Sequence, residues 1–345
     1  MSQTTNFRIK RQYSLIPHSP DRVELRSGVW NPVSFTLTDE ATSGHLFKVL
    51  SRLDGSRTPT ELAKQAGIPR AEVEALLDHL GDLGVIESAP TTALDHYLDT
   101  IVPWRANDQT QNNRPVILMG DPDITQEIER YLKDGLQGTD LLVPNESDPA
   151  WLTLAENDTS WLMDSIEFQE RMSLFEQWRD KLLVVAMKSV NPSQLRVLNR
   201  ICMQLRTPWI HAVIDGPFLF IGPIIVPHRS ACYECLETRV MMNLREHASY
   251  QRYKQIIAEG QVKNGQLSVL PVILGLLAAH TALETLNFAL TGSSFTINKV
   301  LAIYLPTMEF TFNEVLRNPS CTACSSSSER DDKELYFDMG AFIEE

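Results

Sequence analysis

Two pairs of cysteines limit the fold of this chain more than any other feature of its sequence. Cys232 and Cys235 form one Cys-x-x-Cys knuckle, and Cys321 and Cys324 form a second one about 85 residues later. Four thiolates satisfy the tetrahedral coordination of zinc and leave no open position for a water molecule. The sequence therefore predicts a structural zinc site that joins two distant segments of one domain.

A pair of redox dithiols, or four inert thiols, is the alternative to a metal site. Two separate Cys-x-x-Cys knuckles in a chain from a reducing compartment favour metal binding over a disulfide. The first residues, Met1–Thr5, are polar and lack the apolar core of a signal peptide, so we expect a cytoplasmic protein with reduced thiols. The fifth cysteine, Cys202, lies alone on an apolar helix face and is expected in the core.

Size and charge set further limits. The 345 residues exceed what one hydrophobic core usually organises, so two domains are expected. The net charge of -13 opposes attraction to phosphate backbones and anionic lipids, so we expect neither a nucleic-acid nor a membrane partner. The most apolar stretch, Leu267–Leu290, contains Pro271, His280 and Glu284, and it predicts a buried core helix rather than a membrane span.

Residues 1–88 have the pattern of a winged helix-turn-helix domain, with strands first and three short helices after them. Thr38 or Asp39 is expected to cap the first helix, and Gly67 to end the second. The predicted elements are strands at Ser14–Pro17, Arg22–Arg26 and Val33–Thr38, a helix carrying Leu46, Phe47, Val49 and Leu50, a helix opened by Thr60, and a helix over Ala71–Leu83.

Residues 89–114 are predicted as a linker because hydrophobic periodicity fails and a polar run of Asn, Gln and Asp follows. Residues 115–330 alternate short apolar strands with amphipathic helices, which predicts an α/β domain with a doubly wound, mostly parallel sheet. Residues 331–345 form a C-terminal tail. Strands are expected at Pro115–Gly120, Leu141–Val143, Leu182–Met187, Trp209–Ile214 and Phe218–Ile224, and helices at Ile124–Leu132 and Ser193–Leu205.

Within residues 182–239 the sequence becomes similar to a known family. It contains Leu-Leu-Val-Val-Ala, then Thr-Pro-Trp at 207–209, Gly-Pro at 222–223 and the first cysteine knuckle. Over about residues 115–325 the chain resembles the adenylating domain of ubiquitin-activating-enzyme-like proteins of the ThiF and MoeB type. The resemblance implies the fold of that domain and a structural zinc held by the two knuckles.

The chain departs from this family at the phosphate-binding turn. The family has a glycine-rich turn there, because glycines let the backbone approach nucleotide phosphates at a helix N-terminus. This chain keeps Gly120 but continues with Asp121, Pro122 and Asp123. Pro122 removes a backbone N–H, and the two carboxylates repel a phosphate.

A second departure concerns the family's magnesium and arginine positions. When the family motif is aligned on Asn199, Val190 takes the place of the acid that would hold magnesium, and Leu195 takes the place of the arginine. Arg196 is adjacent, but one residue along a helix turns a side chain by about 100°. We therefore expect a domain that binds no nucleotide and has lost ATP chemistry.

A winged-helix domain fused to a degenerate adenylating domain resembles a narrower group. This group comprises the leader-peptide-binding partner proteins of thiazole/oxazole-modified microcin biosynthesis, called ocin-ThiF-like or F proteins, and the related cyclodehydratase C subunits. The N-terminal domain is similar to the PqqD-type peptide-recognition element, and the similarity lies at residues 38–39 (Thr-Asp), 53–58 (Leu-Asp-Gly-Ser-Arg-Thr), 61–62 (Glu-Leu) and 80–86 (Leu-Gly-Asp-Leu-Gly-Val-Ile).

This resemblance implies a function in the biosynthesis of a ribosomally made, bacteriocin-type peptide antibiotic. The chain would be a non-catalytic subunit that captures the leader peptide of the precursor and presents its core to a separate YcaO-type cyclodehydratase. That enzyme would use ATP to cyclise Cys, Ser or Thr residues to azolines. The resemblance also implies a homodimer.

Strand addition is the physical mechanism that we expect for leader capture. An extended peptide would pair with the exposed edge of Val33–Thr38, with side chains entering a groove against the third helix. The alternative is that these side chains only form core and surface, because a shift of one residue moves every side chain to the other face. The candidate contacts are Val33, Phe35 and Leu37 on the strand and Glu72, Ala75 and His79 on the helix.

Two other functions compete with this interpretation. The first is an active ATP-dependent adenylating enzyme of the ThiF and MoeB type. The second is a transcription regulator that reads DNA with its winged helix. Against the regulator, the helix over Ala71–Leu83 carries four acidic residues and no Lys or Arg, which leaves no contacts for phosphate or guanine. The apolar motif Phe337–Ile343 is a hypothetical docking segment for a second copy or for the cyclodehydratase.

Overall fold

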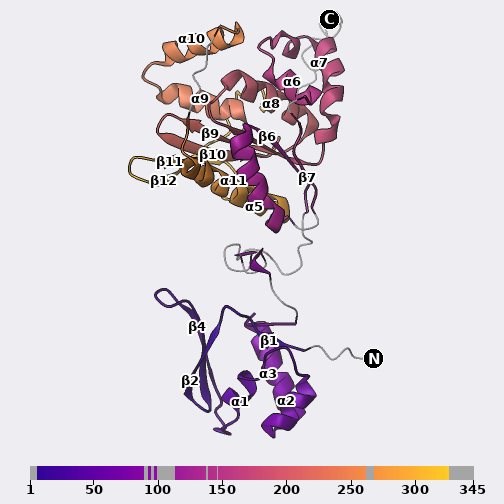
Figure 1. Cartoon of the computed structure of the whole chain (residues 1–345), viewed down its shortest axis with the longest axis vertical. Coiled ribbons are helices and arrows are strands. Elements are labelled where there is room, and N and C mark those ends of the chain that lie inside the picture. Colours follow the sequence, from indigo (N-terminus) through magenta and orange to yellow (C-terminus); the bar gives the residue numbers. More distant parts are fainter. Residues whose placement is uncertain are drawn as a thin grey trace, which may run out of the picture. The chain divides into compact units, whose positions relative to one another are not determined.

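The computed structural model describes residues 6–88, 92–94, 97–98, 113–136, 139–145, 147–261 and 268–325. The chain divides into two compact units, Met1–Arg105 and Ala106–Glu345 (Figure 1). Most of the predicted linker 89–114 and all of the predicted tail 331–345, including the motif Phe337–Ile343, lie outside the described residues. Each unit is described by itself below.

Within residues 6–88, the N-terminal unit contains two small antiparallel sheets and three helices. β2, β3 and β4 pair in that order, so that β4 lies at one edge, and β1 pairs with β5. The winged-helix interpretation of this arrangement stays a prediction. The elements are β1 (Arg8–Ile9), β2 (Ser14–Ser19), β3 (Arg22–Ser27), β4 (Val33–Thr38), α1 (Leu46–Leu50), α2 (Pro59–Ala66), α3 (Arg70–Asp82) and β5 (Ile86–Glu87).

Helix α2 shows how local sequence fixes these boundaries. The Thr58 hydroxyl accepts a hydrogen bond from the Glu61 N–H at 3.3 Å, and the Glu61 carboxylate accepts one from the Thr58 N–H at 2.9 Å, which makes a reciprocal capping box. Gly67 ends the helix with a φ of 78°, a conformation that glycine adopts at little cost. The expectation that Thr38 or Asp39 caps α1 was wrong. The Asp39 carboxylate instead accepts hydrogen bonds from the N–H groups of Ala41 and Ser43.

The C-terminal unit is built on a seven-stranded sheet with the order β12-β11-β10-β9-β8-β6-β7. β7, β6, β8 and β9 are parallel neighbours, and β10, β11 and β12 continue the sheet antiparallel. β11 therefore points in the same direction as β9, so five of the seven strands run one way. The strands are β6 (Val116–Gly120), β7 (Leu141–Leu142), β8 (Leu182–Met187), β9 (Trp209–Asp215), β10 (Phe218–Ile225), β11 (Lys299–Tyr304) and β12 (Glu309–Glu314).

Helices cover both faces of this sheet (Figure 1). α5 (Pro122–Gly135) and α11 (Pro271–Thr291) pack against each other and against the central strands. α8 (Pro192–Leu205) packs on the opposite face, in the same hydrophobic cluster as Ile117, Leu183 and Val185. The remaining helices are α6 (Pro149–Ala155), η1 (Ser160–Leu162), α7 (Ser165–Met172), η2 (Ser173–Trp178), α9 (Tyr233–Asn243) and α10 (His247–Ala258).

Helix α11 is the apolar stretch that the sequence analysis predicts in the core. Of the described helices, it is the one long and apolar enough to cross a membrane by length and composition. In this unit it packs on α5, β8, β9 and β10, and the side chains of its second half are almost all buried. Its apolar character is thus accounted for by packing against the sheet.

Gly120 is required by the close approach of β6 and β8. It pairs with Ala186 in the parallel ladder and has a φ of +127°. A Cβ atom at this position would lie 1.8 Å from the carbonyl oxygen of Ala186. The glycine that the sequence shares with the family's phosphate-binding turn therefore has a packing role in this chain.

Candidate metal centre and ligand sites

The four cysteines of the two knuckles converge in the C-terminal unit. All four are buried, and their sulfur atoms lie within 4.8 Å of one another. Cys232 Sγ is 3.6 Å from Cys321 Sγ and 3.9 Å from Cys235 Sγ, and Cys235 Sγ is 3.5 Å from Cys324 Sγ. A tetrahedron with Zn–S bonds of about 2.3 Å has S···S edges of about 3.8 Å. The cluster therefore has the size and donor set of a four-thiolate metal centre.

Local structure delivers each knuckle to the cluster. Cys232 is the N-cap of α9, and Cys235 lies in its first turn, whereas Cys321 and Cys324 lie in turns that follow β12. The Asn318 N–H donates to Cys235 Sγ at 3.3 Å. Hydrogen bonding from the Cys232 thiol is the largest cause that lowers the pKa of Cys235, with Cys324 and this N–H acting in the same direction, which favours a thiolate there.

Polar partners outside the cluster hold the two knuckles together. The Thr322 hydroxyl, between the cysteines of the second knuckle, donates to Glu234 Oε2 in the first knuckle at 2.7 Å. The Arg317 guanidinium donates to the carbonyl oxygens of Cys324 and, at 3.0 Å, of His228. Such outer contacts orient metal ligands, and here they tie α9 to the segment after β12.

Carboxylates occupy the edge of the sheet where the resembling family binds phosphates. Asp121 Oδ2 accepts a hydrogen bond from the Lys188 N–H at 2.5 Å, and the Lys188 ammonium pairs with the Asp123 carboxylate. These contacts link the ends of β6 and β8 directly. Because two carboxylates lie beside one ammonium group, this edge favours a cation over a phosphate.

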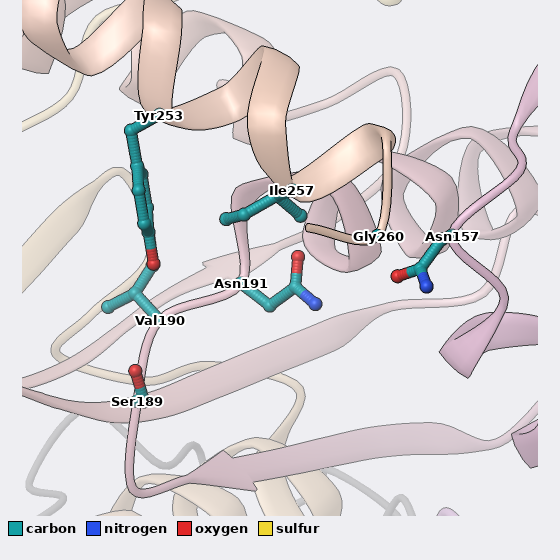
Figure 2. Close-up of a pocket in the computed structure, with 7 residues that line it drawn as sticks. All are labelled: Asn157, Ser189, Val190, Asn191, Tyr253, Ile257 and Gly260. Carbon is teal, nitrogen blue, oxygen red and sulfur yellow. The ribbon is translucent and has the colours of Figure 1, made fainter. Parts of the chain in front are cut away.

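A small pocket of about 100 Å³ lies after β8, where α10 covers the loop that leads to α8 (Figure 2). Val190, the residue at the family's acid position, lines it, and Figure 2 shows the Tyr253 hydroxyl pointing toward Val190. Among the described residues that line this pocket, none carries a charge. The volume is below the roughly 300–1,000 Å³ of typical ligand pockets.

Leu195, at the family's arginine position, and the adjacent Arg196 lie in different environments. Leu195 is completely buried in the cluster beneath α8. The Arg196 side chain is half exposed, and its Nε lies 3.7 Å from Glu234 Oε1. Arg196 therefore faces α9, as expected for a residue one position along the helix.

The sequence analysis did not predict a larger cavity of about 890 Å³ in the same unit. Residues of η1, α8, α9 and α10 line it, together with Thr322 of the second knuckle. In the sequence, the only sign of this cavity is the pair Arg196 and Arg200, which lie four residues apart and so on the same face of one helix. The other lining residues come from elements that lie far apart along the chain.

His211 is buried in the core of the C-terminal unit. Its ring lies beside the rings of Trp209 and Tyr233, with centroids 5.8 and 6.1 Å away. Its Nδ1 atom has no hydrogen-bond partner among the described residues. Burial lowers the pKa of His211 from 6.5 to about 4.

In the N-terminal unit, β4 offers an open edge for strand addition. The Asp39 N–H donates to the Asp21 carbonyl at 2.8 Å, next to the register pair Arg22 and Thr38. Because hydrogen-bonded and non-hydrogen-bonded pairs alternate in an antiparallel ladder, Val33, Phe35 and Leu37 direct their backbone groups toward β3. The N–H and C=O groups of Ser34, Thr36 and Thr38 therefore face the open edge.

The predicted contact side chains of β4 have unequal exposure. Val33 is 57% exposed and Phe35 is half-buried with its ring 6.0 Å from that of Tyr13. Leu37 is only 7% exposed and packs in the core with Val23 and Leu25, and the contact of its side chain with a peptide stays a prediction. Val33, Phe35 and Leu37 lie on the same face of the strand, and burial on this face increases toward the C-terminal end of the strand, where Leu37 is buried.

The three predicted contacts on the third helix lie together on one exposed face of α3. Glu72, Ala75 and His79 are all exposed, and the buried residues Val73 and Leu77 lie on the opposite face. α3 packs mainly against α2 and β5. The structure thus brings these three residues to one surface of the unit.

No protein-family model matches the chain. The curated protein HesA of Nostoc sp. (strain PCC 7120 / SAG 25.82 / UTEX 2576) is 27% identical over 138 residues, which are 40% of this chain and 47% of HesA. The heterocyst protein HesA of Trichormus variabilis is also 27% identical over 138 residues, which are 44% of its length. The chain therefore matches less than half of these curated relatives.

Solved structures match almost the whole chain. A heterocyclase in complex with substrate and cofactor has a TM-score of 0.67 and 16% identity, over 93% of this chain and 40% of its own. The heterocyclase TruD has a TM-score of 0.63 and 18% identity, and the match covers 94% of this chain and 43% of TruD. MccB of E. coli with MccA-N7isoASN has a TM-score of 0.54 and 14% identity, and the match covers 93% of this chain and 99% of MccB. These similarities show a shared fold.

Proposed function

We propose that this chain is a non-catalytic recognition subunit in the biosynthesis of a ribosomally made, modified peptide. It binds the leader peptide of the precursor and presents the core to a separate YcaO-type cyclodehydratase, which forms azolines with ATP. The observation that carries the proposal is the unequal coverage of the heterocyclases. They align with 93–94% of this chain but with only 40–43% of their own length.

The similarity to the heterocyclases is limited to less than half of their length. More than half of each heterocyclase chain has no counterpart among the 345 residues of this sequence. In the proposed function, the catalytic part is a partner protein, and this chain provides recognition and assembly. A homodimer and a cytoplasmic location belong to the same proposal.

Leader capture takes place at the open edge of β4. Backbone groups of Ser34, Thr36 and Thr38 pair with an extended peptide and provide affinity, while neighbouring side chains select the sequence. The candidate side-chain contacts are Val33, Phe35 and Leu37 and the α3 face of Glu72, Ala75 and His79. Leu37 also holds the strand in place from the core.

The proposed loss of ATP chemistry rests on the sheet edge after β6 and β8. Lys188 is engaged by Asp121 and Asp123, and the neighbouring pocket at Val190 has neither a metal-binding acid nor the volume of a nucleotide site. The cysteine cluster supports a structural role for zinc, since all four cysteines are buried and their four thiolates would complete a tetrahedral coordination sphere.

The second candidate function is an active adenylating enzyme. It is favoured by the coverage of MccB, of which 99% aligns with this chain, and MccB has been solved with AMPCPP. The acidic face of α3 argues against the third function, a transcription regulator, because Glu72, Glu74 and Asp78 are exposed there.

Two measurements on the purified protein separate the first two functions. The first is fluorescence-polarisation binding of labelled leader peptides from short open reading frames beside the gene. The second is exchange of pyrophosphate into ATP, with an active adenylating enzyme as positive control. Leader binding without exchange supports the recognition subunit, whereas peptide-dependent exchange would establish an adenylating enzyme and overturn the proposal.

A further inference from the structure

The cavity of about 890 Å³ in the C-terminal unit carries more positive charge than its own acids neutralise. Arg196, Arg200, Arg252 and Lys254 all line it. Lys254 is engaged, because its Nζ lies 2.9 Å from Oε1 of the buried Glu237, which also accepts a hydrogen bond from Tyr250. The other acid of the cavity, Glu234, lies 3.7 Å from Arg196 and accepts a hydrogen bond from Thr322. Both acids therefore already have partners within the protein.

Two of the arginines that line the cavity have no acidic partner among the described residues. Arg196 is the partner of Glu234 at 3.7 Å. Within the part of the chain that the structure describes, Arg200 and Arg252 make neither an ion pair nor a hydrogen bond. They come from α8 and α10, two helices that pack against each other. A guanidinium group binds a carboxylate or a phosphate with paired N–H groups, so this wall is suited to an anion.

The lining of the cavity also includes apolar side chains. Leu162 and Met163 line it, and Met163 is 83% exposed although it is a large apolar side chain. A nucleoside triphosphate needs several hydrogen-bond donors to its phosphates, whereas this cavity combines apolar side chains with two guanidinium groups that are unpaired within the described part of the chain. That combination matches a short peptide in which carboxylates flank an apolar side chain.

The candidate metal centre supports one wall of this cavity. Glu234 and Thr322 line the cavity and belong to the two cysteine knuckles, and their side chains are joined by a hydrogen bond of 2.7 Å. Glu234 in turn faces Arg196. The segments that hold the cysteines therefore position this side of the cavity.

We propose that this cavity is a binding site for an acidic peptide segment of a partner polypeptide, held by Arg200 and Arg252 with an apolar side chain against Met163. The site is separate from the β4 edge and goes beyond leader capture. Its ligand chemistry is a carboxylate-bearing segment of a second polypeptide.

The test uses the full chain and two labelled, end-blocked hexapeptides: Asp-Leu-Glu-Asp-Leu-Glu and its neutral counterpart Asn-Leu-Gln-Asn-Leu-Gln. We expect the acidic peptide to bind at least about tenfold more tightly, with affinity that falls as salt rises. Arg200→Ala and Arg252→Ala should each weaken its binding about fivefold or more. Arg245→Ala, an exposed arginine outside the cavity lining, should leave it unchanged.

Three results would overturn the proposal: equal binding of both hexapeptides, wild-type affinity in both cavity variants, or complete displacement of the acidic peptide by millimolar inorganic phosphate. The acidic stretch Glu329–Glu334 follows Thr322 closely in the sequence. If only a variant lacking residues 329–345 bound the hexapeptide, the site would belong to this chain's own segment, and the assignment to a partner would fail. A Thr36→Pro variant with intact hexapeptide binding separates this site from leader capture.

Discussion

A proline at Thr36 tests the proposed mode of leader capture most directly. The Thr36 N–H faces the open edge of β4 and takes no part in the ladder with β3, as the alternation from the Asp39–Asp21 hydrogen bond requires. Proline removes this donor, and its ring blocks the approach of a pairing strand. Proline is tolerated on an edge strand when its nitrogen faces solvent, so Thr36→Pro should retain the fold.

The expected loss of affinity follows from the hydrogen bonds of strand addition. One net hydrogen bond contributes about 1 kcal/mol, and a leader carbonyl left without a donor costs about 1 kcal/mol more. A loss of about 2 kcal/mol corresponds to an approximately thirtyfold rise in Kd. Thr36→Ala keeps the N–H and should bind within about twofold of the wild type.

The assay is fluorescence polarisation with labelled leader peptides, accompanied by circular dichroism and thermal melting of each variant. Phe35→Pro is the matched control for the fold, because the Phe35 backbone faces β3 and its replacement should disrupt the ladder. A Thr36→Pro protein that melts like the wild type and binds the leader with unchanged Kd would refute strand addition at this edge.

Three further predictions concern stability. Cys321→Ser should lower both the zinc content and the melting temperature, since three ligands leave the site incomplete, whereas Cys202→Ala should keep its zinc; unchanged zinc content by metal analysis of Cys321→Ser would contradict the proposed centre. The folded-state pKa of His211 is about 4, below its ordinary 6.5, so the unfolded chain takes up a proton first as the pH falls. Stability is therefore lost from pH 6.5 down through pH 4, by about 3 kcal/mol, and His211→Phe should abolish this loss in urea unfolding followed by tryptophan fluorescence. An equal pH dependence in both proteins would be evidence against a neutral His211. Gly120→Ala should destabilise the C-terminal unit by at least about 3 kcal/mol because its Cβ meets the Ala186 carbonyl, while Gly81→Ala in the exposed part of α3 should stabilise by up to about 1 kcal/mol; similar melting of the two variants would contradict this reasoning.

Local patterns predicted much of the secondary structure. The bounds expected for β4 and β8 are those of the structure, because alternation marks the half-exposed strand and a continuous apolar run marks the buried one. The meeting of the two cysteine knuckles was also expected from the chemistry of zinc. In each case, the signal lies in the residue types themselves.

Features that depend on long-range packing were not predictable in the same way. The sequence analysis did not anticipate β11 and β12, and all six residues of β12 are exposed, which removes the usual burial pattern of a strand. Alternation placed Leu37 on one face with Val33 and Phe35 but did not show that this face meets the core. The cavity at Arg200 and Arg252 arises from helix packing that no local pattern records.

The distance along the chain between the two cysteine knuckles has a kinetic consequence. A metal bound by all four thiolates closes a loop of about 85 residues, which contains α10, α11, β11 and β12. Closing a loop of this length in an unfolded chain costs roughly 2 kcal/mol more in entropy than closing the loop of about 12 residues in a small zinc finger. The sheet must therefore bring the knuckles together before the second pair of ligands engages. During refolding, we expect the completed metal centre to form late, as a lock on an assembled domain and not as its nucleus.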